Sequence, residues 1–173
     1  MTITTRAPVA PTPAPPAVDR VARGVAARIA AAAAGPLIRV LVIGAGGRAT
    51  AEALRERGDV GRVPSVLELA LPHDGGPYDG GDPHAPDVLA DACWLPLPDG
   101  IVDLCVSRTR LAAGPDPLGY LAELIRVTRP GGLVAVVGDP DEARNLGRHL
   151  KTRKDVARVP GRGFNAHLVR RLA

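Results

Sequence analysis

An apolar segment that runs directly into a cluster of glycines is the most restrictive feature of this sequence. Residues 37–43 are almost entirely apolar, and Gly44, Gly46 and Gly47 follow them at once. Good helix formers then occupy residues 49–57. A strand, a glycine-rich turn and a helix in this order predict an α/β fold that binds a nucleotide or a nucleoside. The glycines suit such a turn because a backbone without a Cβ can lie directly against the ligand.

The rest of the chain alternates predicted strands and helices, as an α/β fold requires. One helix is expected to start at Pro117, because Asp116 is a suitable cap and proline a suitable first helical residue. We expect Pro130-Gly-Gly132 to end this helix. The other predicted elements are a helix that starts at Val18 and stops at Gly35-Pro36, strands over residues 87–91, 102–107, 133–137, 156–159 and 166–172, and a helix over residues 141–153.

The second strand of the sheet is open to two interpretations. Residues 64–71 could begin a helix at Pro64 or form a strand. We favour a strand, because Glu68 lies 24 residues beyond Gly44. That separation is close to the one at which a carboxylate binds ribose in nucleotide-binding α/β domains.

The segment after this strand is unusual for a parallel sheet. Residues 70–86 contain four glycines and four prolines, so the crossover between the second and third strands cannot be a regular helix. One crossover helix is therefore predicted to be missing, although parallel sheets are normally covered on both faces. We expect this face to be covered by the Val18 helix, by the loop itself, or by another chain in a homodimer or with a protein partner.

The N-terminal composition predicts a tail followed by one domain. Residues 1–17 include five prolines and cannot bury enough apolar surface to become ordered, whereas residues 18–173 form a single predicted domain. No basic start is followed by an uninterrupted apolar run, so neither a secretion signal nor a membrane span is expected. Cys93 and Cys105 lack the spacing of a metal site or a redox pair. We therefore expect a cytoplasmic protein with free thiols and no metal.

Two further motifs complete a recognisable pattern. Asp91-Ala92 precedes Leu95-Pro96, and Arg126-Val127 precedes Pro130-Gly-Gly132. With the glycine turn, these motifs resemble the class I S-adenosylmethionine-dependent methyltransferases of the type 11-like group, over roughly residues 37–173. The resemblance implies a Rossmann-like, doubly wound, mostly parallel sheet with an antiparallel C-terminal edge strand.

The resemblance also implies a cofactor and the residues that hold it. The cofactor is S-adenosylmethionine, with the glycine turn against its methionine part. Glu68 would accept hydrogen bonds from the ribose hydroxyls, a role that a carboxylate suits. Asp91 would accept from the adenine amino group, while a turn-capping role is the alternative for this residue. The implied cofactor-binding residues are Gly44, Gly46, Gly47, Glu68, Asp91 and Ala92.

Two positions depart from the family pattern. Val42 stands where the family usually has an acid, and Arg48 stands where it has a further glycine. Arg48 is able to pair with the methionine carboxylate instead. These departures keep open a methyltransferase-like protein that no longer methylates and either serves as a structural or regulatory partner or is recruited to another reaction. A third alternative is an NAD(P)-binding module, because Gly44-x-Gly46-x-x-Ala49 also fits the dinucleotide fingerprint.

The remaining signals favour a small-molecule acceptor over a nucleic acid. Aromatic residues make up only 2% of the chain, too few for a base-stacking surface. After residue 140 the sequence contains nine Lys or Arg and only three acidic residues, and we interpret this basic excess as a solvated surface. Arg108 and Arg110 follow a predicted strand, where they suit either an acidic substrate or a plain surface role. We interpret the histidines and aspartates of the glycine loop as polar loop residues rather than a metal or general-base site: His73, Asp74, Asp82, His84 and Asp87.

Overall fold

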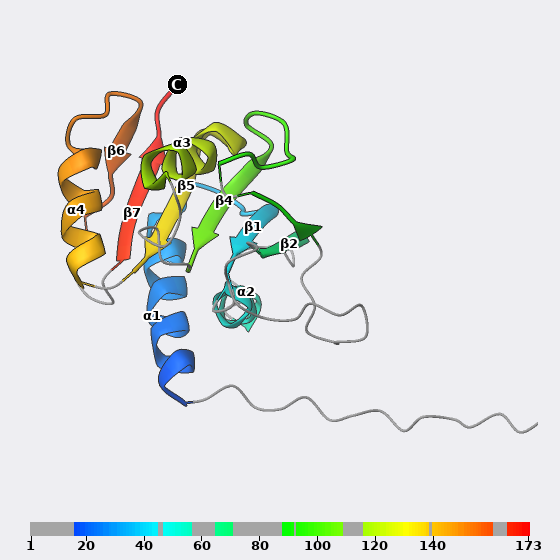
Figure 1. The fold of residues 1–173 in the computed structure, drawn as a ribbon. Helices are drawn as coiled ribbons and strands as arrows, with labels where there is room; N and C mark the ends of the chain where they lie inside the picture. The colour runs from blue at the N-terminus through cyan, green and yellow to red at the C-terminus, as the bar shows by residue number, and fades with distance from the viewer. Residues whose placement is uncertain are drawn as a thin grey trace, which may run out of the picture.

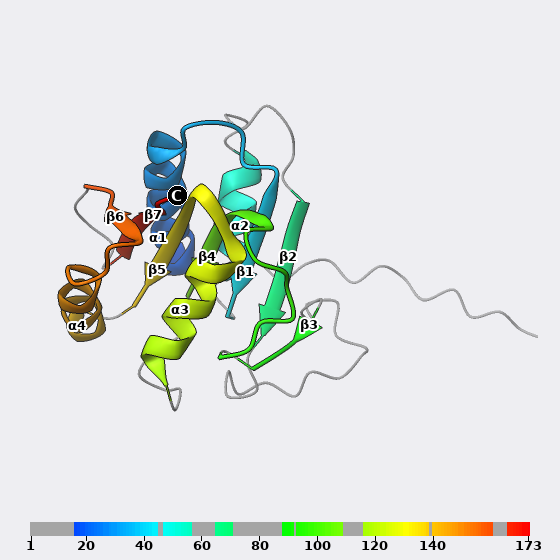
Figure 2. The same ribbon diagram turned by 90° about the horizontal axis from the view of Figure 1, so that it is seen from above.

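The computed structural model describes residues 16–44, 47–56, 65–70, 88–91, 93–108, 116–138, 140–160 and 166–173. In these residues a seven-stranded sheet carries helices on both faces (Figures 1 and 2). The elements in chain order are α1 (Pro16–Ala32), β1 (Arg39–Ile43), α2 (Gly47–Glu56), β2 (Ser65–Ala70), β3 (Val88–Leu89), β4 (Val102–Ser107), α3 (Pro117–Val127), β5 (Thr128–Val137), α4 (Pro140–Leu150), β6 (Val156–Arg158) and β7 (Ala166–Arg171).

The strand order is β3-β2-β1-β4-β5-β7-β6, which confirms the predicted doubly wound sheet. The pairs from β3 across to β5 are parallel, and β7 is antiparallel to both β5 and β6. The chain moves outward from β1 to β2 and β3, then returns to the other side of β1 as β4. The carboxyl ends of β1 and β4 therefore form the switch point, where open α/β sheets bind their ligands.

The side chains of β1 alternate between two buried cores. Leu41 and Ile43 pack with residues of α3 and α4, whereas Val40 and Val42 pack with residues of α1 and α2. None of the four is more than 1% exposed. Figure 2 shows the two helical layers on opposite sides of the sheet. Burial on both faces explains why the central strands are continuous apolar runs.

The predicted start of α3 is confirmed. The Asp116 carboxylate accepts hydrogen bonds from the backbone N–H groups of Leu118 at 3.1 Å and Gly119 at 2.8 Å. These bonds satisfy N–H groups that have no partner within the helix. Pro117 is the first helical residue, a position where the backbone N–H that proline lacks would have no helical partner.

The predicted end of α3 is wrong. The helix ends at Val127, and β5 begins at Thr128 and includes Pro130-Gly-Gly132. Pro130 disfavours helix in the residue before it, and contacts from β7 stabilise the earlier end: the Arg171 guanidinium donates to the carbonyl oxygens of Ile125 at 3.2 Å, Arg126 at 2.8 Å and Thr128. This side chain binds the carbonyl oxygens at the end of the helix, which lack helical partners.

Other expectations hold with shifted limits. Residues 65–70 form a strand, so the strand interpretation of residues 64–71 is confirmed. The third strand is shorter than predicted, because a turn begins at Asp91. The glycine loop, most of the predicted tail and the predicted absence of a crossover helix lie outside the described residues. None of the helices described is long and apolar enough to cross a membrane.

The amino ends of the strands are held together by Asp103. Its carboxylate accepts from the backbone N–H groups of Ile38 at 3.0 Å and Arg39 at 2.8 Å, and it pairs with Arg129. Burial alone would raise the pKa of Asp103, but hydrogen bonds from Arg39, Arg129 and Ile38 outweigh it and lower the pKa. This network fixes the sheet at the end opposite the switch point.

Candidate functional site

The first part of the site is the turn after β1. Gly44 has φ = 90°, a backbone conformation that residues with a Cβ rarely adopt. Helix α2 begins three residues later, at Gly47. A helix N-terminus carries N–H groups without helical partners and a partial positive charge, so it favours an anionic group. The predicted strand and helix are therefore present at the switch point, and Gly44 follows the strand directly.

The second part of the site is the arginine after β4. The backbone N–H of Arg108 donates to the carbonyl oxygen of Ile43 at 2.9 Å, and its guanidinium lies 3.4 Å from the hydroxyl oxygen of Thr50 on α2. Burial lowers the pKa of the Arg108 guanidinium, which stays protonated at neutral pH. The side chain therefore reaches from the end of β4 to the first turn of α2.

A buried hydroxyl pair fixes the last residue of β4. Ser107 is fully buried, and its Oγ accepts a hydrogen bond from the Tyr120 hydroxyl at 2.9 Å. Tyr120 belongs to α3, so the pair connects the end of β4 to the helix that covers this face. A fixed strand end holds Arg108 in place.

The third part of the site is the turn that follows β3. Asp91 is exposed, and its Oδ1 accepts from the backbone N–H of Cys93 at 2.8 Å. The backbone N–H of Trp94 donates to the Asp91 carbonyl oxygen at 3.1 Å. Asp91 therefore has the turn-capping role, which is the alternative interpretation of its motif. Its Oδ2 accepts no hydrogen bond from the described residues, so the carboxylate can cap the turn and bind a ligand.

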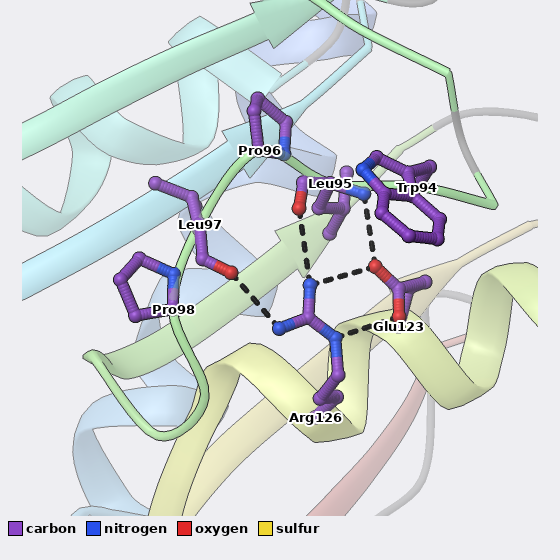
Figure 3. Close-up of a pocket in the computed structure, with 7 residues that line it drawn as sticks. All are labelled: Trp94, Leu95, Pro96, Leu97, Pro98, Glu123 and Arg126. Carbon is purple, nitrogen blue, oxygen red and sulfur yellow. Dashed lines mark hydrogen bonds and ion pairs between the residues drawn. The ribbon is translucent and has the colours of Figure 1, made fainter.

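Two side chains of α3 hold the segment after this turn (Figure 3). The Arg126 guanidinium donates to the carbonyl oxygens of Leu95 at 3.0 Å and Leu97 at 2.9 Å. Glu123 accepts from the backbone N–H of Leu95 at 2.9 Å and from Arg126 at 2.7 and 2.8 Å. The sequence pattern includes Arg126 without assigning it a role, and it does not point to Glu123. Their spacing of three residues on a helix is the signal that could have identified the pair.

The same segment forms one wall of an open pocket of about 540 Å³. Trp94 at its mouth is 80% exposed, although it is a large apolar side chain. Trp94 is not among the predicted site residues. The residues that line the pocket are Trp94, Leu95, Pro96, Leu97, Pro98, Glu123 and Arg126.

The other predicted site residues are placed in part. Glu68 lies in β2, in register with Val42 of β1. Val42 is 1% exposed and packs in the core beneath α2, so it contributes to packing. Gly46 and Ala92 lie outside the described residues, as do the side chains of Glu68 and Arg48.

Comparisons with known proteins agree with this geometry. The family model described as a methyltransferase domain matches residues 41–136. An uncharacterized methyltransferase of Mycobacterium ulcerans is 39% identical over 93 residues, which are 54% of this chain and 35% of that protein. One from Mycobacterium sp. strain JLS is 37% identical over 91 residues, 45% and 36% of the two chains. The chain thus spans a little over a third of the length of these curated relatives.

Two solved structures share the fold. A candidate S-adenosyl-L-methionine-dependent methyltransferase of Methanococcus maripaludis has a TM-score of 0.63 at 14% identity, and the match covers 89% of this chain and 86% of that one. A SAM-dependent methyltransferase of Aquifex aeolicus has a TM-score of 0.58 at 19% identity, over 80% and 84% of the two chains. The family match covers more than half of the chain and runs from within β1 to within β5, including the turn at Asp91. The chain therefore belongs to the class I S-adenosylmethionine-dependent methyltransferase family, whose cofactor is S-adenosylmethionine.

Proposed function

We propose that this chain transfers a methyl group from S-adenosylmethionine to a small-molecule metabolite. The observation that carries the proposal is the meeting of Gly44, the start of α2 and the Arg108 cation at the carboxyl ends of β1 and β4. This is the ligand-binding crevice of a doubly wound sheet. The family match supports a methyltransferase over the NAD(P)-binding alternative.

The residues present fit the chemical groups of the cofactor. The positive φ of Gly44 allows the backbone to approach the methionine part closely. The Arg108 guanidinium and the N-terminus of α2 suit the methionine carboxylate. The Oδ2 of Asp91 suits the adenine amino group, because an ionised carboxylate only accepts hydrogen bonds. Glu68 stays the predicted partner of the ribose hydroxyls.

Methyl transfer requires the protein mainly to orient the cofactor and the acceptor relative to each other. When bound, the cofactor supplies a methyl group on a sulfonium centre, which is open to in-line displacement by a nucleophilic atom of the acceptor. Gly44, Arg108 and Asp91 would fix the cofactor at three separate points. Holding the cofactor in one orientation toward the acceptor can supply a large part of the rate enhancement.

A small-molecule acceptor is favoured by the sequence. The chain has few aromatic side chains to stack on bases, and it lacks the Asn/Asp-Pro-Pro-Tyr and Pro-Cys motifs of DNA methyltransferases. A homodimer or a protein partner near residues 70–86 stays a prediction.

Isothermal titration calorimetry tests the cofactor proposal. We expect S-adenosylmethionine and S-adenosylhomocysteine to bind with micromolar dissociation constants, and NADH not to bind. Asp91→Asn should weaken both, because the amide keeps the turn-capping oxygen but puts a donor in place of Oδ2. Binding of NADH alone would instead support the dinucleotide alternative.

An activity screen tests the acceptor proposal. The purified protein is incubated with S-adenosylmethionine and pools of small metabolites, and S-adenosylhomocysteine is quantified by mass spectrometry. Product that forms only with an added metabolite supports the proposal. Tight cofactor binding with no turnover on any metabolite pool would favour the methyltransferase-like protein that no longer methylates.

A further inference from the structure

We propose that Glu123 and Arg126 form a positioning pair that holds the Asp91 turn in the conformation that selects adenine. The inference rests on the proposed function, in which Asp91 accepts a hydrogen bond from the adenine amino group. In this inference neither Glu123 nor Arg126 contacts the cofactor. Both act through the backbone of residues 95–97.

The pair holds several backbone groups of one short segment. Arg126 binds the carbonyl oxygens of Leu95 and Leu97, at 3.0 and 2.9 Å, and Glu123 binds the N–H of Leu95 at 2.9 Å. Three backbone groups, two of Leu95 and one of Leu97, are thus fixed by one charged pair. The two side chains lie on one face of α3 and also bind each other, so neither can move alone.

The connection from Leu95 to Asp91 is short. Trp94 donates to the Asp91 carbonyl oxygen, and Cys93 donates to Asp91 Oδ1 at 2.8 Å, so the turn is closed directly before Leu95. The side chain of Leu95 is 2% exposed and packs in the core with Leu121. A shift of Leu95 therefore moves the turn and with it the Asp91 carboxylate.

Both members of the pair are charged and directed at the segment. The Arg126 hydrogen bond lowers the pKa of Glu123, while bonds to Glu123 and Asp99 raise the pKa of Arg126. Both groups are therefore charged across the neutral range. Figure 3 shows the guanidinium directed at the backbone segment and at Glu123. The hydrogen-bonding groups of the pair are thus used by the backbone of residues 95–97 rather than by a ligand in the adjoining pocket.

Nucleobase selectivity tests this role, because a general loss of stability does not change it. S-adenosylhomocysteine is compared with S-inosylhomocysteine, whose base carries an oxo group in place of the amino group. We expect the wild type to prefer the adenine compound by about tenfold or more, since an unpaired polar contact is costly. Arg126→Gln should lose most of this preference while the protein stays folded by circular dichroism.

A double-mutant cycle shows whether the effect passes through Asp91. In the Asp91→Asn background, Arg126→Gln should cause no further change in the ratio of the two dissociation constants, because the selecting carboxylate is already lost. Glu123→Gln keeps the side-chain volume and is the milder second variant if Arg126→Gln does not fold. It should reduce the preference in the same direction.

Arg170→Gln is the matched control. Arg170 also donates to two backbone carbonyl oxygens, those of Gly131 at 2.8 Å and Ala32 at 2.6 Å, but it lies away from the turn. It should lower the melting temperature and keep the wild-type preference. Arg126→Gln or Glu123→Gln with wild-type preference, or an equal loss in the Asp91→Asn background, would overturn the inference. A wild type that binds neither compound would overturn the proposed function as well, so the two failures are distinguishable.

Discussion

The backbone N–H of Arg108 donates to the carbonyl oxygen of Ile43, so the first residue after β4 is bound to the last residue of β1. The two residues are far apart in sequence but adjoin at the switch point of the sheet. Their hydrogen bond fixes the distance between a cation and the glycine turn. A ligand with an anionic group at this turn should therefore depend on Arg108.

Arg108→Gln should weaken binding of S-adenosylhomocysteine roughly tenfold, because a charge-assisted hydrogen bond to the methionine carboxylate is lost. 5′-Methylthioadenosine has no methionine carboxylate, so its affinity should not change. Calorimetric titration of both ligands checks this prediction. An equal loss for the two ligands would show that Arg108 acts on the turn as a whole and not on the carboxylate.

Tyr120→Phe should destabilise the fold by about 1 kcal/mol, because Ser107 Oγ is buried and loses a donor at 2.9 Å. The free energy of unfolding in urea measures the change. The double variant with Ser107→Ala removes both partners and should be more stable than the sum of the single changes predicts. Strict additivity of the two substitutions would argue against the hydrogen bond.

Gly132→Ala should destabilise the fold by about 1–3 kcal/mol. A Cβ at this position would lie 2.8 Å from the Arg129 carbonyl oxygen and 2.9 Å from that of Asp103, and backbone atoms cannot easily give way. Gly35→Ala is the matched control, because a Cβ added there would meet nothing within 4 Å. Urea unfolding should show a loss for the first variant and no loss for the second.

The pH dependence of stability should carry the signature of Asp103. Its pKa is lowered in the folded state from the ordinary value of 3.8, so the stabilisation is fully present above that value and is lost as the pH falls through the folded pKa. Asp103→Asn should therefore reduce the free energy of unfolding at pH 7. The difference from the wild type should shrink as the pH falls below 3.8. A difference that is equal at neutral and strongly acidic pH would contradict this assignment.

The sequence is sufficient where local chemistry determines the structure. The strand over residues 102–107 is predicted with its observed limits, because four of its six residues are apolar and the charged Arg108 follows it. The start of α3 follows from the cap at Asp116. The end of α3 is harder to predict in this way, because the carbonyl oxygens there bind Arg171, which lies 45 residues beyond Arg126.

The residues of the candidate site also differ in how well the sequence predicts them. Gly44 and Asp91 belong to local turns, so their sequence motifs are informative. The contact between Arg108 and Thr50 joins residues 58 positions apart, and sequence spacing carries no record of it. The contacts of Glu123 with Leu95 are also long-range. Residues that hold a site in place are harder to predict than residues that lie in its turns.

The position of β7 between β5 and β6 has a consequence for synthesis on the ribosome. Strand β6 is translated before β7 but pairs only with β7 among the described strands. The pairing of β6 is therefore delayed until β7 has also emerged from the ribosome. The parallel strands from β1 to β5 can assemble during that interval, whereas completion of the sheet is a late step. During this delay the edge of β5 that later pairs with β7 is open to pairing with another chain.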